Sequence, residues 1–205
     1  METVSVPLIE YGVAKFVLPG QSESGDLHLV RCDNDSALIA VIDGIGHGQE
    51  AANAAKAAVA VLKDGIGEPV ISLATMCHEK LKATRGVVMS LASVDTRHRM
   101  VTWLGVGNVQ GVLLRGGCRQ GSPQEVLLLR GGVVGSQLPA LQAAVLPVCA
   151  GDTLVFATDG IRSDFSEKLS ALEAPQRAAD RILQRYCSGS DDALVLVARL
   201  TGIST

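Results

Sequence analysis

A chain of 205 residues suits one large domain or two small ones and is long enough to bury a full hydrophobic core. Apolar residues make up 47% of it and charged residues 19%, which is typical of a globular protein and excludes a disordered one. The net charge of −3 and the aromatic content of 3% argue against a nucleic-acid-binding surface and against binding to anionic membranes.

Five cysteines are scattered singly and form no Cys-x-x-Cys pair, so the sequence indicates neither a zinc knuckle nor a disulfide framework. Their odd number fits free thiols in a reducing compartment, where they serve as small core residues. The first twelve residues lack the basic start and apolar core of a signal peptide. No run of about 18 apolar residues predicts a membrane-spanning helix. We therefore expect a cytoplasmic protein.

The N-terminal part of the chain predicts short strands followed by two helices. Alternation of apolar and polar residues indicates strands at residues 4–9, 13–18 and 26–32, with a turn at 10–12 between the first two. A continuous apolar run indicates a further strand at 36–42, buried on both faces. An alanine-rich run without proline or glycine predicts a helix from Gln49 to about Lys63. An apolar stripe at helical spacing predicts a second helix over about 69–84.

The C-terminal part predicts mainly strands. These are expected at residues 86–95, 100–105, 109–114, 125–129, 143–148, 152–157 and 193–200, with a short helical segment at 166–172 and a better helix at 175–187. No internal repeat or linker divides the chain, so residues 1–205 are expected to form a single domain. Strands and helices occur in blocks and do not alternate, which predicts an α+β fold with two mainly antiparallel sheets.

The stretch over residues 37–62 joins a buried strand, a glycine-rich turn and a helix. Asp43 stands where the strand ends, and three glycines within residues 44–48 permit positive φ and close approach of another group. The glycine spacing fits neither the dinucleotide-binding nor the phosphate-loop motif. Asp43 therefore either caps the turn or binds a cation, and an Asp-Gly pair taken alone is more often a structural turn.

Further acids recur at strand ends beside flexible turns. Asp26 begins a strand, and Asp159 ends one before a glycine. Asp191 and Asp192 directly precede the last strand. If these strands are neighbours, the carboxylates meet Asp43 at one rim, and divalent cations would relieve their repulsion. All-oxygen ligands select Mg²⁺ or Mn²⁺, and a water between two such ions would become a nucleophile that hydrolyses a phosphate ester.

Five short motifs follow one another along the chain: Ser24-Gly25-Asp26, residues 43–48 (DGIGHG), Gly107-Asn108, Thr158-Asp159-Gly160 and Asp191-Asp192. Each is weak singly, but the ordered set resembles that of the PPM family, the metal-dependent protein serine/threonine phosphatases. The resemblance covers about residues 10–200 and is strongest to the bacterial SpoIIE-like branch. A catalytic domain without a regulatory domain, with glycines at 131–135 and Leu138-Pro139, is similar to the phosphatases of that branch that reset the stressosome.

The resemblance implies a PPM-type α-β-β-α sandwich, two mainly antiparallel sheets flanked by helices, with two bound Mn²⁺ or Mg²⁺ ions and a third, weaker ion left open. Asp43 would bridge the ions, and the carbonyl of Gly44 would bind one of them. Asp159 and Asp191 would complete the second site and would be catalytic together with Asp43. The metal ligands implied are Asp26, Asp43, Gly44, Asp159, Asp191 and Asp192, with Asp26 acting directly or through water and Asp192 at a supporting position.

Two positions depart from the family pattern. In eukaryotic relatives a proposed general acid, a histidine, stands two residues after the bridging aspartate. Here that residue is Ile45, and the role does not pass to His47. No clear equivalent of the eukaryotic phosphate-binding arginine is found near the N-terminus, because Arg31 falls within a strand. The general acid and the phosphate anchor are therefore left open.

The resemblance implies that the protein hydrolyses phosphoserine or phosphothreonine on STAS-domain stressosome proteins and so resets the general stress response. We expect a monomer that binds neither nucleic acid nor membrane. A second hypothesis is a catalytically weak or inactive PPM-like module that binds stressosome or anti-sigma partners; the retained Asp43, Asp159 and Asp191 argue against it. A third keeps the metal site for a small phosphomonoester. The helices expected after Asp43 match elements that position this aspartate in SpoIIE-like enzymes, so a switching role is a further hypothesis.

Overall fold

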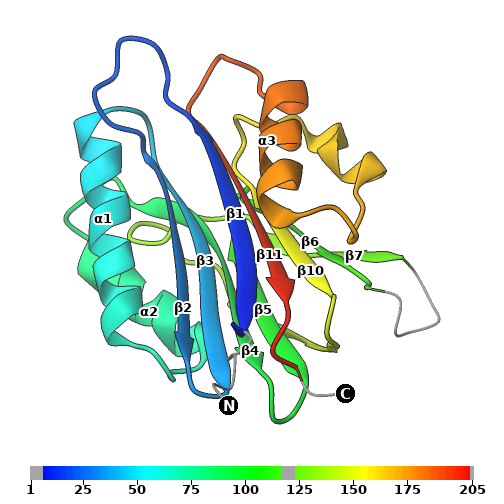
Figure 1. Ribbon diagram of the computed structural model, residues 1–205. Helices are drawn as coiled ribbons and strands as arrows, with labels where there is room; N and C mark the ends of the chain where they lie inside the picture. Colours follow the sequence, from blue (N-terminus) through cyan, green and yellow to red (C-terminus); the bar gives the residue numbers. More distant parts are fainter. Residues whose placement is uncertain (1–6, 117–122, 204–205) are drawn as a thin grey trace, which may run out of the picture.

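Two β-sheets stacked face to face, with helices on both outer sides, make up the part of the chain that the computed structural model describes, residues 7–116 and 123–203 (Figure 1). The first sheet has the order β1-β11-β10-β6-β7, formed by β1 (Ile9–Phe16), β11 (Ala193–Leu200), β10 (Thr153–Ala157), β6 (Gln110–Leu114) and β7 (Gln124–Val126). The second has the order β2-β3-β4-β5-β8, formed by β2 (Asp26–Asp33), β3 (Ser36–Gly44), β4 (Val87–Asp95), β5 (Met100–Val106) and β8 (Leu129–Arg130).

A short strand, β9 (Ala144–Pro147), also pairs with β5. β5 and β8 are parallel, and the other strand pairs are antiparallel. The helices are α1 (Gln49–Asp64), α2 (Val70–Leu81), α3 (Pro175–Tyr186) and the 3₁₀ helix η1 (Ser163–Lys168). In the described ranges, no helix is long and apolar enough to cross a membrane. The α+β sandwich with two mainly antiparallel sheets, predicted from the sequence, is confirmed.

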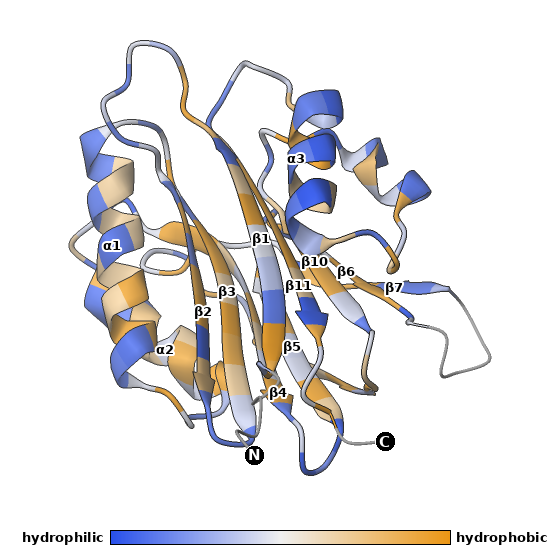
Figure 2. Ribbon diagram, in the orientation of Figure 1, coloured by the Kyte–Doolittle hydropathy of each residue, from blue (hydrophilic) through white to orange (hydrophobic). Residues whose placement is uncertain are grey.

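Apolar side chains fill three layers of this sandwich. Ile39, Trp103 and Phe156 are buried between the two sheets. Helices α1 and α2 cover the outer face of the second sheet, where the small side chains of α1, such as Ala55, allow close packing. Helix α3 and η1 cover the outer face of the first sheet. Figure 2 shows the same division, with apolar residues along the strands and many polar residues on α3.

The prediction of a hairpin at the N-terminus is wrong. In place of two strands around a turn at 10–12, β1 runs straight through these residues and pairs with β11 along its whole length (Figure 1). Residues 4–6 of the expected first strand lie outside the described residues. Gly12 serves packing and not a turn, because a Cβ atom there would lie 2.3 Å from the backbone of Gln176 in α3. The first and last strands therefore lie side by side.

The expected strand at 125–129 is divided between the two sheets. Its first part is β7, which pairs with β6, and its last residue belongs to β8, which pairs with β5. The turn expected at 105–108 likewise does not form a hairpin, since β5 and β6 lie in different sheets. The helical segment expected at 166–172 begins earlier, as η1. The other predicted helices and strands agree with the structure to within a few residues.

The cysteines only partly match the expectation of free core thiols. Cys77 is buried and free, whereas Cys32 is free but exposed and Cys187 is free and half-buried. Cys149 is disulfide-bonded, so the expectation is wrong there. Cys118 lies outside the described residues.

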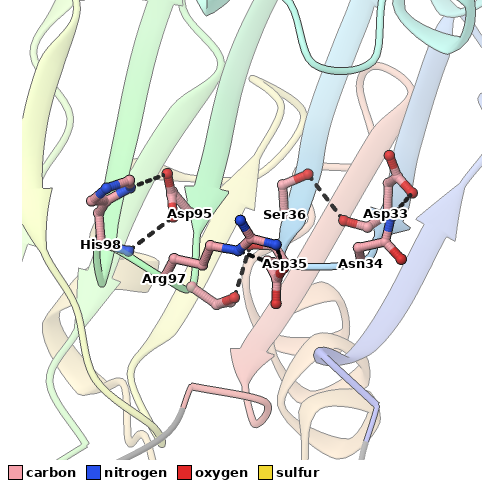
Figure 3. Close-up of polar contacts among 8 residues, drawn as sticks. Asp33, Asn34, Asp35, Ser36, Asp95, Arg97 and His98 are labelled. Carbon is pink, nitrogen blue, oxygen red and sulfur yellow. Dashed lines mark hydrogen bonds and ion pairs between the residues drawn. The ribbon is translucent and has the colours of Figure 1, made fainter.

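Two polar turns close one end of the second sheet (Figure 3). Arg97 forms an ion pair of 2.5 Å with Asp35, and His98 contacts Asp95 at 2.7 Å. These turns join β2 to β3 and β4 to β5. They lie at the opposite end of β3 from Asp43, so substitutions in these turns can serve as controls far from the acids.

Candidate metal centre

Two aspartates face each other where β2 begins and β3 ends. Asp26 and Asp43 are direct partners in the antiparallel pairing, an arrangement that places two side chains on the same face of the sheet about 4.5–5.5 Å apart at Cβ. The pairing continues past them, because the amide of Gly44 donates to the carbonyl of Gly25 at 3.1 Å. Asp26 is 2% exposed and Asp43 is half-buried. The strand register therefore brings the two carboxylates together.

The end of β10 connects this pair to the other sheet. The hydroxyl of Thr158 donates to Oδ2 of Asp26 at 2.7 Å and accepts from the amide of Leu194 at 2.8 Å. All three residues are buried. One hydroxyl group thus joins Asp26, the first residue of β2 in the second sheet, to the end of β10 and the start of β11 in the first sheet.

Asp192 organises the turn that leads into β2. Its carboxylate accepts from the amides of Leu18 and Gly25, both at 2.8 Å, and its side chain is buried. Because each oxygen already holds a backbone donor, Asp192 shapes the loop before Asp26. Its neighbour Asp191 is exposed and accepts from the Asp192 amide at 2.8 Å.

Asp159 reaches the same rim from the end of β10. It is exposed, and its Oδ2 accepts from the side-chain amide of Asn108 at 2.8 Å. The family motifs in the sequence included Gly107-Asn108 but gave Asn108 no role at the site. Sequence reasoning also gave Thr158 no role of its own. Both contacts join residues from distant parts of the chain.

The cluster raises the pKa of two of its acids, Asp43 and Asp26. Burial raises the pKa of Asp43 to about 9, and the charges of the four other acids add to the rise. Burial also raises the pKa of Asp26 to about 7, against the lowering effect of the hydrogen bond from Thr158. The structure therefore brings all five carboxylates named by the sequence into one electrostatic cluster.

The residues of this cluster fit a divalent cation. No hydrogen bond or ion pair from any other described residue reaches the Asp43 carboxylate. The available donors are carboxylate and carbonyl oxygens, which Mg²⁺ and Mn²⁺ prefer. Within the described ranges no three His, Cys, Asp or Glu side chains form a ready-made metal-binding group. The Gly44 carbonyl and water would have to complete the coordination, which suits an ion that retains several waters.

Helix α1 approaches the centre because Gly44 has no side chain. A Cβ atom at Gly44 would lie 2.2 Å from the carbonyl oxygen of Ala51 in the helix. A Cβ atom at Gly25 would in turn be 3.1 Å from the Cβ atom of Ala51 and 3.3 Å from the Gly44 oxygen, so the backbone of Gly25 also lies close to this oxygen. The glycine-rich turn thus positions the helix, the strand end and the expected metal-binding carbonyl together.

The structure shows where the residues lie at the two positions that depart from the family pattern. Ile45 packs against the core between the sheets, and His47 is exposed and contacts the side chain of Gln21 at 3.3 Å. Arg31 lies elsewhere, with its guanidinium donating to the carbonyl of Lys63 at the end of α1. None of these contacts provides a phosphate anchor at the acidic rim.

Comparison with solved structures shows which proteins share this fold. A chain described under "The bacterial stressosome: a modular system that has been adapted to control secondary messenger signaling" superposes with a TM-score of 0.83 at 28% identity, covering 93% of this chain and 99% of that one. The crystal structure of RsbX in complex with magnesium superposes with a TM-score of 0.82 at 22% identity, covering 94% of this chain and 96% of that one.

The sequence comparisons identify the family. Residues 33–201 match the family described as Stage II sporulation protein E (SpoIIE), and the chain belongs to this family. It is 30% identical over 94 residues to the phosphoserine phosphatase RsbX of Bacillus subtilis (strain 168), an alignment over 46% of this chain and 47% of that relative. The match thus spans about half the length of RsbX. The predicted SpoIIE-like membership is confirmed, and so is the predicted resemblance to RsbX.

Proposed function

We propose that this protein is a Mn²⁺- or Mg²⁺-dependent phosphatase that hydrolyses phosphoserine or phosphothreonine on proteins. The observation that carries the proposal is the facing pair Asp26 and Asp43, in which no described residue donates a hydrogen bond to Asp43, at a rim that three further acids share. Membership of the SpoIIE family supports it. The relative RsbX is named a phosphoserine phosphatase, and its crystal structure is a complex with magnesium.

The chain's own residues have distinct tasks in this proposal. Asp43 would bridge two ions, the Gly44 carbonyl would bind one, and Asp159 and Asp191 would hold the second, with a third, weaker ion left open. When bound, the ions would neutralise phosphoryl oxygens and activate the attacking water. Thr158 would keep Asp26 oriented toward them through its hydrogen bond. In the same way Asn108 would orient Asp159, and Asp192 would hold the turn before Asp26.

We infer further that the substrates are phosphorylated STAS-domain proteins of the stressosome. The similarity to RsbX and to a chain described with the bacterial stressosome supports this class of partner. The net charge of −3 gives no reason to expect nucleic acid or membrane as a partner. In this proposal residues 1–205 act as one catalytic domain, as a monomer in the cytoplasm.

Hydrolysis of p-nitrophenyl phosphate with and without Mn²⁺ tests the proposal. We expect turnover that requires the metal and is lost in Asp43→Asn and Asp159→Asn. Asp33→Asn, at the opposite end of the second sheet (Figure 3), should keep full activity. A folded protein that hydrolyses neither this ester nor a phosphorylated STAS-domain protein with any divalent ion would refute the enzyme and favour the binding module.

A further inference from the structure

Arg85, in the connection between α2 and β4, lies against the loop that follows Asp43. A Cβ atom at Gly46 would be 2.8 Å from Nη1 of Arg85, so the guanidinium passes directly over the Gly46 backbone. The amide of Ile45 donates to the carbonyl of Gly86 at 3.1 Å and ties the two segments together. With a φ of 94°, Gly46 is in the left-handed region that favours glycine. The absence of a side chain there leaves space for the guanidinium.

The present partner of Arg85 binds it weakly. Nη2 of Arg85 lies 2.5 Å from Oε2 of Glu50, in the first turn of α1. The two side chains are 55% and 68% exposed, and exposed ion pairs of this kind contribute little to stability. The guanidinium can therefore leave Glu50 for a stronger anion without disturbing the fold.

An open depression lies beside this ion pair. Its volume is about 410 Å³, and it is lined by Glu50, Asn53, Ala83, Thr84 and Arg85. The residues that line it come from the first half of α1 and from the connection that follows α2. These two segments border the loop that follows Asp43. A segment of a protein substrate next to its phosphorylated residue could occupy this space.

The negative charge of the acidic rim means that a positively charged side chain is needed to attract the phosphate. A phosphoserine carries a charge of about −1.5 to −2 at neutral pH. Two divalent ions would add four positive charges to a cluster of five carboxylates, which leaves no excess positive charge to attract the phosphate. A guanidinium can donate two parallel hydrogen bonds to phosphate oxygens.

We propose that Arg85 binds the phosphoryl group of the substrate. In this inference, which rests on the proposed function, Arg85 exchanges Glu50 for the phosphate, and the substrate residues that flank the phosphoserine occupy the depression. Arg85 thus fills the place of the phosphate anchor that the sequence left open. It comes from the connection after α2 and not from the N-terminal part of the chain.

Kinetics of Arg85→Ala and Arg85→Lys on a phosphorylated STAS-domain protein, at saturating Mn²⁺, test this inference. The matched control is Arg97→Ala, because Arg97 is also exposed and paired at 2.5 Å with a carboxylate but lies at the far end of β4 (Figure 3). We expect kcat/KM to fall about tenfold or more in Arg85→Ala, less in Arg85→Lys, and to stay within about twofold in Arg97→Ala. The melting temperature and the Mn²⁺ affinity should not change.

Binding of inorganic phosphate to the Mn²⁺-loaded protein, measured by calorimetry, gives a second readout. Arg85→Ala should weaken it, and Glu50→Gln, which releases the guanidinium from its partner, should strengthen it about two- to threefold. If the wild type turns over substrate and Arg85→Ala behaves like Arg97→Ala in both measurements, Arg85 is not the anchor. If the wild type shows no Mn²⁺-dependent turnover, the proposed function fails and this inference fails with it.

Discussion

The carboxylate of Asp43 is half-buried among four other acids and receives no hydrogen bond from a described residue. In the metal-free protein its charge is therefore unfavourable. Asp43→Asn keeps the shape of the side chain and removes the charge. We expect this variant to raise the stability of the metal-free protein by about 1–2 kcal/mol, or about 2–8 °C in Tm. Calorimetry without metal measures this gain.

The same variant should respond differently to metal. Mn²⁺ should raise the Tm of the wild type, because binding to the folded state stabilises it, but should raise that of Asp43→Asn little. Asp33→Asn, at the far end of the sheet (Figure 3), should behave like the wild type in both conditions. A metal-free Asp43→Asn that melts below the wild type would contradict the electrostatic account.

Thr158 allows a second test at the scale of a single side chain. Its hydroxyl joins Asp26 to the amide of Leu194 in a buried position. Thr158→Val keeps the shape but leaves both partners unpaired, so we expect a loss of about 1–3 kcal/mol and about tenfold weaker Mn²⁺ binding. Thr158→Ser keeps the hydroxyl and should keep the affinity. Titration calorimetry and thermal melting measure both effects, and equal Mn²⁺ affinity in the two variants would exclude a role in metal binding.

The packing of whole elements depends on a few glycines. Helix α3 lies on β1 because Gly12 leaves room for the backbone of Gln176, whose side chain also bonds both the amide and the carbonyl of Val13. Gly12→Ala would force the helix away from the strand. We expect a loss of about 1–3 kcal/mol, measured by urea unfolding.

The control for this change is Gly131→Ala. A Cβ atom at Gly131 would have nothing within 4 Å, so its stability should stay within about 0.5 kcal/mol of the wild type. Equal effects of the two substitutions would show that the contact of Gly12 with α3 is not tight. Because α3 lies on the opposite side of the sandwich from α1, Mn²⁺ affinity should be unaffected in Gly12→Ala.

At the scale of the whole molecule, the acids make the stability of the metal-free protein depend on pH. The pKa of Asp43 rises from its ordinary value of 3.8 to about 9, and that of Asp26 to about 7. The folded state therefore holds protons that the unfolded state releases, so the stabilisation is complete below about pH 4 and is lost as the pH rises toward 9.

We expect the free energy of unfolding of the metal-free protein, measured by urea titration, to fall between pH 5 and pH 8.5. Asp43→Asn should flatten this dependence, and Mn²⁺ should reverse it, because the cation binds the charged carboxylates. A metal-free stability that rises over the same range would show that the two acids are ionised in the folded state at neutral pH.

Local patterns in the sequence determined much of this fold. Alanine content and helical spacing placed α1 and α2, alternation placed β2, and a continuous apolar run placed β3. These patterns are local, because a helix or half-buried strand buries one face with a fixed period and a strand between two layers buries both faces. The motifs around Asp43, Asp159 and Asp191 similarly identified the acids that the structure brings to one rim. These features are encoded by residues that are close in the sequence.

The tertiary structure alone decided how these elements meet. Only the packed sheets show that β1 is continuous, that β5 and β6 belong to different sheets, and that residues 125–129 divide between β7 and β8. The hydrogen bond from Thr158 to Asp26 and the position of Arg85 over Gly46 were equally absent from the motifs. Thr158 and Asp26 are 132 residues apart, and no local periodicity encodes such a contact. Burial of apolar surface between the two sheets brings these residues together, and it depends on the whole chain at once.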